Sequence, residues 1–176
     1  MIEHKVLMTG PVGSGKTTAV RSLSYKEVIC TDVDASDITL NRKPTTTVAM
    51  DYGVYHAGRE RIHLYGTPGQ ERFDFMWDIL SVGAAGLILL IDNSRENPLQ
   101  DMKHYLKLFP SFVNRGKVVI GVTYTDVSPS PEINQYSKEL SKLGFDFPVY
   151  AIDARKSDDV IDTIYALIDM KDTQAA

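Results

Sequence analysis

Two patterns of hydrophobic residues alternate along this chain, and together they predict a regular order of strands and helices. Short, continuously apolar runs predict strands that are buried on both faces, at residues 6–8, 86–91, 118–122 and 149–152. Apolar residues that recur every three or four positions predict amphipathic helices, over residues 99–109, 133–143 and 160–168.

Residues 47–64 follow a different pattern, in which apolar and small or polar residues alternate one by one. The alternation runs from residue 47 to residue 54 and resumes at Ile62 and Leu64, after a turn at residues 56–59. Two alternating strands joined by a short turn form a hairpin, and its strands are antiparallel.

Local signals mark where two of the helices begin. Ser130-Pro131 predicts the start of the helix that Gly144 ends, and Ser157-Asp158-Asp159 predicts a cap for the last helix. The whole pattern predicts an α/β fold with a six-stranded, mostly parallel sheet, one antiparallel strand, and helices on both faces. Ligands of such sheets bind outside the carboxyl ends of the strands.

Length and charge narrow the class of protein. The 176 residues fit one domain, which we expect to span residues 1–176, and 43% hydrophobic and 24% charged residues are typical of a globular chain. The net charge is −4, with Lys and Arg spread along the sequence. A nucleic-acid surface or a polybasic membrane patch is therefore not expected.

We expect a cytoplasmic protein without a membrane anchor. The single cysteine, Cys30, excludes an internal disulfide and fits a reducing compartment. The N-terminus is too short and polar for a signal peptide, the longest apolar run (84–91) is too short for a membrane span, and no lipidation motif is present.

Residues 10–17 read GPVGSGKT and match the P-loop pattern G-x-x-x-x-G-K-[ST], directly after a predicted strand. The glycines let backbone N–H groups surround a phosphate, and the N-terminus of the following helix adds partial positive charge. Lys16 is expected on the β- and γ-phosphates and the Thr17 hydroxyl on Mg²⁺. The motif predicts a P-loop NTPase fold, but it does not choose among GTPases, ATPases and small-molecule kinases.

Two further segments, PTTTVAMDY at 44–52 and GTPGQERF at 66–73, resemble the two switches of Ras-like small GTPases. More narrowly, they resemble a prokaryotic branch of that superfamily whose members often work with Roadblock-type partners. The resemblance covers nearly the whole chain. It implies a Mg²⁺-dependent protein that hydrolyses GTP to GDP and acts as a nucleotide-dependent switch for an effector or activating protein.

The resemblance assigns roles to residues of the switches. Thr47 would bind Mg²⁺ through its hydroxyl and the γ-phosphate through its N–H, Gly69 would donate its N–H to the same phosphate, and Gln70 would orient the attacking water. Val12 stands where Ras has glycine and crowds the space of an arginine supplied by a partner. Arg42 is then a candidate catalytic arginine in cis, or else a solvated loop cation.

The base-binding motifs depart from the family pattern. Asn-Lys-x-Asp is replaced by TYTD at 123–126, in which Asp126 still accepts from guanine N1–H and the 2-amino group. The asparagine that ties this loop to the P-loop is lost, and Tyr124 is expected to stack on the base in place of the lysine. Asp153-Ala154-Arg155 replaces Ser-Ala-Lys, with the Ala154 N–H toward guanine O6.

The expected site residues fall into three groups. The nucleotide-binding residues are Gly10, Gly13, Ser14, Gly15, Lys16, Thr17, Thr18, Thr47, Gly69, Tyr124, Asp126, Ala154 and Arg155. The catalytic residues are Gln70 and Arg42, and the metal ligands are Thr17 and Thr47.

Gly66 stands where Ras-like proteins place an aspartate that orients Mg²⁺. Asp51 lies four residues beyond Thr47, roughly 13 Å further along an extended strand, and is expected to be too distant to replace it. Thr67 is adjacent to Gly66, so we expect its hydroxyl to hold a water in the outer shell of the ion.

Three alternatives stay open on sequence alone. A nucleotide-binding module without hydrolysis would explain Gly66 and the altered base motif, although retention of Gln70 favours turnover. A small-molecule kinase would need an acceptor pocket and an Arg-rich lid, and no insertion is long enough. The apolar residues between Phe73 and Trp77 form either the buried face of a helix or a partner surface.

Overall fold

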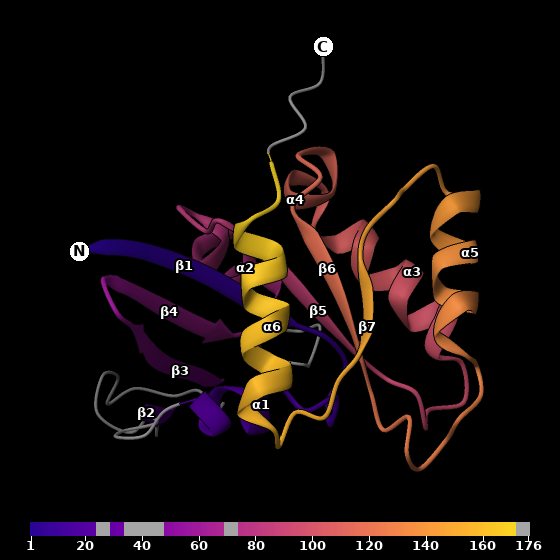
Figure 1. Cartoon of the computed structure of the whole chain (residues 1–176), viewed down its shortest axis with the longest axis horizontal. Coiled ribbons are helices and arrows are strands. Elements are labelled where there is room, and N and C mark those ends of the chain that lie inside the picture. Colours follow the sequence, from indigo (N-terminus) through magenta and orange to yellow (C-terminus); the bar gives the residue numbers. More distant parts are fainter. Residues whose placement is uncertain (24–28, 34–47, 69–73, 172–176) are drawn as a thin grey trace, which may run out of the picture.

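The computed structural model describes residues 1–23, 29–33, 48–68 and 74–171. Within these residues, seven strands form one sheet in the order β2-β3-β4-β1-β5-β6-β7 (Figure 1). The strands are β1 (Ile2–Thr9), β2 (Ile29–Val33), β3 (Val48–Ala57), β4 (Glu60–Gly66), β5 (Gly86–Asp92), β6 (Val118–Thr123) and β7 (Val149–Ala151).

The predicted fold class is confirmed. Only β3 runs against the other strands, because it is antiparallel to both β2 and β4 while the remaining neighbours are parallel. All six expected strands are present. The edge strand β2 is an addition that no hydrophobic pattern in the sequence had predicted.

Helices cover both faces of the sheet, and Figure 1 shows α6 in front of the strands. One face carries α1 (Lys16–Leu23) and α6 (Ser157–Ile168). The other carries α2 (Asp74–Ser81), α3 (Pro98–Leu108), α4 (Pro110–Asn114) and α5 (Ile133–Lys142). No helix in the described ranges is long and apolar enough to cross a membrane.

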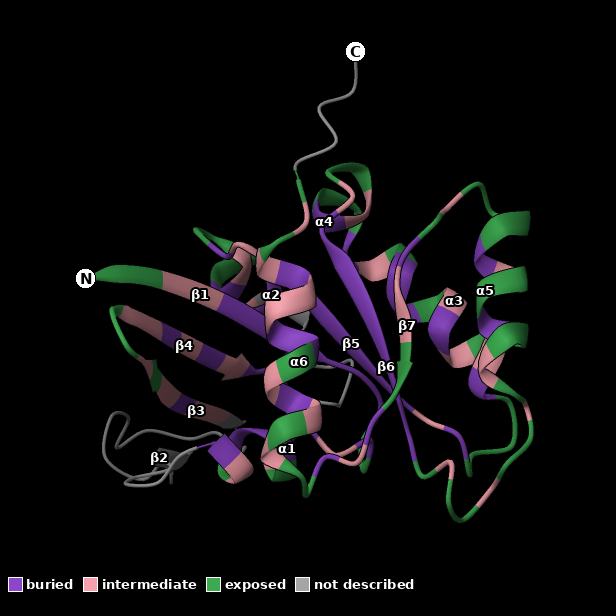
Figure 2. Ribbon diagram, viewed as in Figure 1, coloured by how far each residue is buried: buried purple, intermediate pink, exposed green. Residues whose placement is uncertain are grey.

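The central strands β5 and β6 are buried almost throughout, as their continuous apolar runs predict (Figure 2). Trp77 also belongs to the core: it is 3% exposed and stacks on Phe109 at 5.2 Å. Ile79 in the last turn of the same helix and Val82 just after it are exposed. For Trp77 the buried alternative is therefore correct, while Phe73 lies outside the described residues.

Two predicted helix starts are shifted. The segment Ser130-Pro131 precedes α5, which begins at Ile133, and the Gln135 side chain accepts a hydrogen bond from the Glu132 N–H. In α6 the N-cap is Lys156, and Asp159 instead accepts from the backbone N–H of Asp153 at 2.8 Å. The Asp159 carboxylate therefore ties the loop after β7 to the start of α6.

Candidate functional site

The loop between β1 and α1 requires glycine for two physical reasons. Gly10, Gly13 and Gly15 have φ values of +144°, +82° and +101°, which residues with a Cβ rarely adopt. A Cβ on Gly10 would also lie 2.1 Å from the carbonyl oxygen of Leu90 in β5. The glycines that the sequence assigns to the phosphate cradle are thus fixed by backbone geometry and by close packing against the next strand.

Lys16 is the first residue of α1, and its ammonium is held inside this loop. It donates to the carbonyl oxygens of Gly10 and Pro11, both at 2.7 Å, and lies 3.4 Å from the Ser14 hydroxyl. Burial lowers the pKa of Lys16 from 10.5 to about 8, and the negative charge of Asp51 partly opposes this shift. The loop therefore holds one desolvated cation at the place where the sequence predicts a phosphate.

Asp51 reaches the same place from β3. Its Oδ2 accepts a hydrogen bond from the Thr17 hydroxyl at 2.5 Å. In the β3–β4 ladder Asp51 is the direct cross-strand partner of Gly66. A Cβ on Gly66 would lie 3.0 Å from the Asp51 Cβ and 3.3 Å from its Oδ2. The Asp51 side chain therefore fills the space that a side chain at position 66 would need.

The expectation that Asp51 is too distant is wrong. That expectation considered only the separation of Asp51 from Thr47 along the strand. The contact of Asp51 with Thr17 is made beside Gly66, the partner of Asp51 on the neighbouring strand of the hairpin. The Thr67 hydroxyl donates to the Thr9 hydroxyl at 2.8 Å, and Thr67 is 2% exposed. Of the two candidates to replace the missing aspartate, the structure joins Asp51, not Thr67, to the P-loop threonine.

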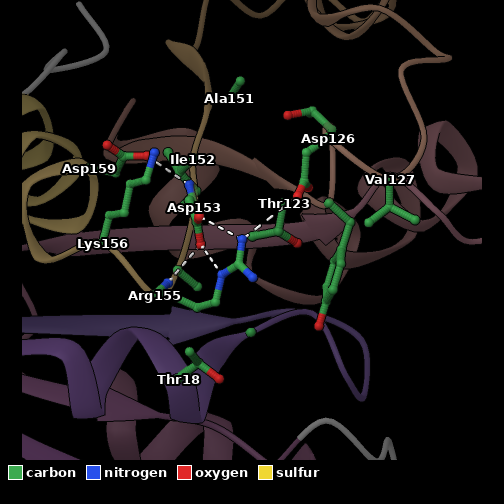
Figure 3. Close-up of a pocket in the computed structure, with 14 residues that line it drawn as sticks. Thr18, Thr123, Asp126, Val127, Ala151, Ile152, Asp153, Arg155, Lys156 and Asp159 are labelled. Atoms are coloured by element: carbon green, nitrogen blue, oxygen red, sulfur yellow. Dashed lines mark hydrogen bonds and ion pairs between the residues drawn. The ribbon is translucent and has the colours of Figure 1, made fainter.

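A cavity of about 710 Å³ adjoins the glycine loop at the carboxyl ends of β6 and β7 (Figure 3). The predicted residues among its lining are Gly15, Thr18, Tyr124, Asp126, Ala154 and Arg155. Tyr124 is 42% exposed and has φ of +59°, the one positive φ of a non-glycine residue in the described ranges. Residues from three distant segments of the chain thus meet around one volume.

Arg155 joins the two loops of this cavity (Figure 3). It donates through Nε and an Nη to the two carboxylate oxygens of Asp153, both at 2.8 Å, and an Nη lies 3.7 Å from Asp126. These hydrogen bonds lower the pKa of Asp153 to about 2. Asp153 therefore holds the guanidinium beside Asp126 at the mouth of the cavity.

Thr123 ties the loop at residues 123–126, where a base is expected, to the glycine loop, although the asparagine expected to make this connection is absent. Thr123 is 2% exposed, and its hydroxyl lies 2.9 Å from the Ser14 carbonyl oxygen and 3.2 Å from that of Ile91. A buried hydroxyl must find such a partner. A threonine at the end of a buried strand was the signal in the sequence.

Asn93 was also missed, and it anchors the far end of the base loop. It is 1% exposed, and its side-chain amide donates to the carbonyl oxygens of Ser128 at 2.6 Å and Pro131 at 3.1 Å. The buried Tyr136 hydroxyl donates to its Oδ1 at 2.6 Å. The loop that carries Asp126 is therefore fixed at both ends by buried polar side chains.

Four of the predicted site residues lie outside the described residues, so their positions stay predictions: Arg42, Thr47, Gly69 and Gln70.

Comparison with known proteins gives one family and several partial relatives. The model of a family described as conserved hypothetical ATP binding protein matches residues 24–170. An uncharacterised protein of Methanocaldococcus jannaschii is 32% identical over 62% of this chain and 63% of its own length. The ADP-ribosylation factor-related protein 1 of Bos taurus is 29% identical over 57% of this chain and 48% of its own.

A Ras-related protein of Arabidopsis thaliana, RABA6a, is 27% identical over 74% of this chain and 53% of its own length. The aligned regions thus span about half to less than two thirds of these curated relatives. Together with the fold, the similarities support nucleotide binding and a place among Ras-like proteins.

Proposed function

The chain belongs to the family described as conserved hypothetical ATP binding protein. We propose that it is a Ras-like switch, which binds guanine nucleotide and Mg²⁺ and hydrolyses GTP slowly. One observation carries the proposal. Gly15 belongs both to the loop that holds the Lys16 ammonium and to the lining of the cavity beside it. The proposed phosphate site and the proposed base site would therefore be continuous, as a nucleotide requires.

Guanine is favoured over adenine by Asp126. Its carboxylate lines the cavity and can accept from both N1–H and the 2-amino group of guanine, whereas adenine offers neither donor. A site built around such an acceptor discriminates against the base that leaves it unpaired. The family is described as ATP binding, so the experiment below separates guanine from adenine nucleotides.

Thr17 and Asp51 supply a hydroxyl and a carboxylate oxygen side by side, and Mg²⁺ prefers oxygen ligands of this kind. We propose that these two residues hold Mg²⁺, together with Thr47 from the first switch. When bound, the ion neutralises charge on the β- and γ-phosphates. Lys16 neutralises the same phosphates from the cradle, and the backbone N–H groups of the loop orient them.

Gln70 of the second switch and Arg42, just before the first switch, supply the proposed chemistry of hydrolysis. Gln70 orients the attacking water, and Arg42 stabilises negative charge on the transferred phosphoryl group in cis. We propose that residues 1–176 act as one G domain whose switches report the bound nucleotide to a partner protein of the Roadblock type. Intrinsic turnover should be about 10⁻⁴ to 10⁻² s⁻¹, as in Ras-like proteins without an activator.

A competition experiment tests the assignment. A fluorescent GDP analogue is bound to the full chain with Mg²⁺ and displaced by GTP, GDP or ATP, with Lys16→Ala as the variant that should not bind. GTP and GDP should compete at least about tenfold better than ATP. Equal competition by ATP would assign an adenine nucleotide instead. Binding of GTP without phosphate release, in wild type and Gln70→Leu alike, would support a binding module without turnover.

A further inference from the structure

A second cavity of about 670 Å³ lies between α3, α4 and the turn after α5. Its lining includes Lys103, Leu106, Lys107, Val113, Leu143 and Phe145. None of its lining residues belongs to the nucleotide cavity. Its volume is within the range of about 300–1,000 Å³ that is typical of small-ligand sites. It is therefore a separate site.

One wall of this cavity is apolar and open to solvent. Leu143 is the C-cap of α5 and is 44% exposed, which is unusual for a leucine beside other apolar side chains. Gly144 follows with φ of +82° and reverses the chain, so that the Phe145 N–H bonds to the Leu140 carbonyl. Phe145 stacks on the buried Phe147 at 5.0 Å. The turn thus holds the side chains of Leu143 and Phe145 at the cavity, and the stacking on Phe147 supports Phe145.

The α3 side of the cavity carries two lysines, together with Asp101. Lys103 and Lys107 are four residues apart on α3 and so lie on the same face of the helix. Within the described residues no ion pair involves Lys107.

The nearby acidic groups are already neutralised. Glu139 is shared by Lys103 and Lys142, each at 2.5 Å, and Asp101 is paired with Arg95 at 2.6 Å. The cations Lys103, Lys107, Lys142 and Arg95 outnumber the carboxylates Glu139 and Asp101, so this group keeps a net positive charge in a chain whose total charge is −4.

From this arrangement we propose that the second cavity binds a small amphipathic carboxylate with a single aliphatic chain. The carboxylate pairs with Lys107, since Lys103 is engaged by Glu139, and the chain covers Leu106, Val113, Leu143 and Phe145. Each end of such a ligand fits one part of the lining. Burial of the aliphatic chain against the apolar residues is favourable in proportion to its apolar area, and the carboxylate gains a charge-assisted hydrogen bond from the lysine. The proposal does not depend on which nucleotide the other cavity binds.

The experiment titrates the full chain with sodium hexanoate, octanoate and decanoate by calorimetry, below their micelle concentrations. Octanol and octyltrimethylammonium are the probes without the negative charge. One carboxylate should bind per chain, with affinity rising up to about fourfold for each added methylene. Lys107→Gln should weaken octanoate binding about tenfold. Lys138→Gln, at an exposed lysine of α5 outside the cavity, is the matched control and should change nothing.

Leu143→Gln tests the apolar wall, and because Leu143 is exposed the variant should fold as wild type does. It should lower the affinity for decanoate more than for hexanoate. Thermal unfolding and affinity for the nucleotide should stay unchanged in both variants. Absence of carboxylate binding in the folded wild type would overturn the proposal. So would equal binding of octyltrimethylammonium, equal losses in Lys107→Gln and Lys138→Gln, or preference for an acidic amphipathic peptide over octanoate.

Discussion

The carboxylate of Asp51 on β3 occupies the space in front of Gly66 on β4 and accepts a 2.5 Å hydrogen bond from Thr17 at the start of α1. The two positions are complementary: one carries a carboxylate and the other carries no side chain. Because a Cβ at position 66 would come within 3.0 Å of the Asp51 Cβ, both cannot hold an aspartate without a shift of the strands. The acidic group next to the P-loop threonine is supplied by the neighbouring strand.

Asp51→Ala should raise the Mg²⁺ concentration needed for tight nucleotide binding by roughly 10- to 100-fold, the usual cost of losing a residue that supports a metal. The measurement is the dissociation rate of a fluorescent GDP analogue as a function of free Mg²⁺. Thr67→Ala should leave this dependence nearly unchanged, because its hydroxyl is engaged with Thr9. Asp146→Asn, at an exposed loop position, is the control for loss of one negative charge.

The double variant Asp51→Gly, Gly66→Asp tests the complementarity itself. It returns the carboxylate to β4 and removes the side chain that would collide with it, so it should recover part of the Mg²⁺ dependence lost in Asp51→Ala. Gly66→Asp alone should lower the thermal unfolding midpoint more than the double variant does. If the single and double variants were equally destabilised, the two positions would not share one space.

Nucleotide binding should take up a proton at alkaline pH. Burial lowers the pKa of Lys16 to about 8, and a bound phosphate restores the charged form. Above pH 8 the affinity should therefore fall by up to about tenfold per pH unit. Calorimetry in two buffers of different ionisation enthalpy should show almost no proton uptake at pH 7 and nearly one proton at pH 9. Uptake that persisted in Lys16→Met would assign the proton to another group.

The same pKa shift has the opposite consequence for the protein without nucleotide. The unfolded chain keeps its proton on Lys16 up to pH 10.5, whereas the folded chain loses it above about pH 8. Between these values the unfolded state binds more protons, so the contribution of Lys16 to the free energy of unfolding rises with pH. Urea unfolding at pH 7.5 and 9.5, compared between wild type and Lys16→Met, isolates this contribution.

Thr123→Val should weaken guanine nucleotide binding about tenfold, because the Ser14 carbonyl loses its buried donor and the two loops lose their connection. Valine keeps the shape of threonine, so the change is limited to the hydroxyl. Thr123→Ser keeps the hydroxyl and should restore most of the affinity. A purely structural role would lower the unfolding midpoint of the valine variant while leaving its affinity for guanine nucleotide unchanged.

Asp126→Asn should shift the preference from GTP toward xanthosine triphosphate by at least about tenfold, since the amide can donate to the carbonyl that replaces the 2-amino group. Competition against the fluorescent analogue measures both affinities. Arg155→Gln, which removes the cation 3.7 Å away, should weaken both nucleotides without reversing the preference. An unaltered preference in Asp126→Asn would exclude this carboxylate from base recognition.

The sequence by itself determined most of the elements and the loops proposed to bind nucleotide. Hydrophobic periodicity is a local property, so it located β5, β6 and the helices that cover them. The glycines of residues 10–15 predicted a loop whose backbone conformation only glycine tolerates. The resemblance to Ras-like proteins located the expected base-binding loops, which follow directly after two buried strands.

The tertiary structure decided which side chains meet. A turn over residues 56–59 would pair Asp51 with Leu64, whereas the observed hairpin closes at Gly58 and Arg59, with Ala57 opposite Glu60, and so pairs Asp51 with Gly66. Likewise, the hydroxyl of Thr123 finds a carbonyl 109 residues away. Such contacts depend on strand register and on the closure of long loops. The periodicity of a single segment determines neither of them.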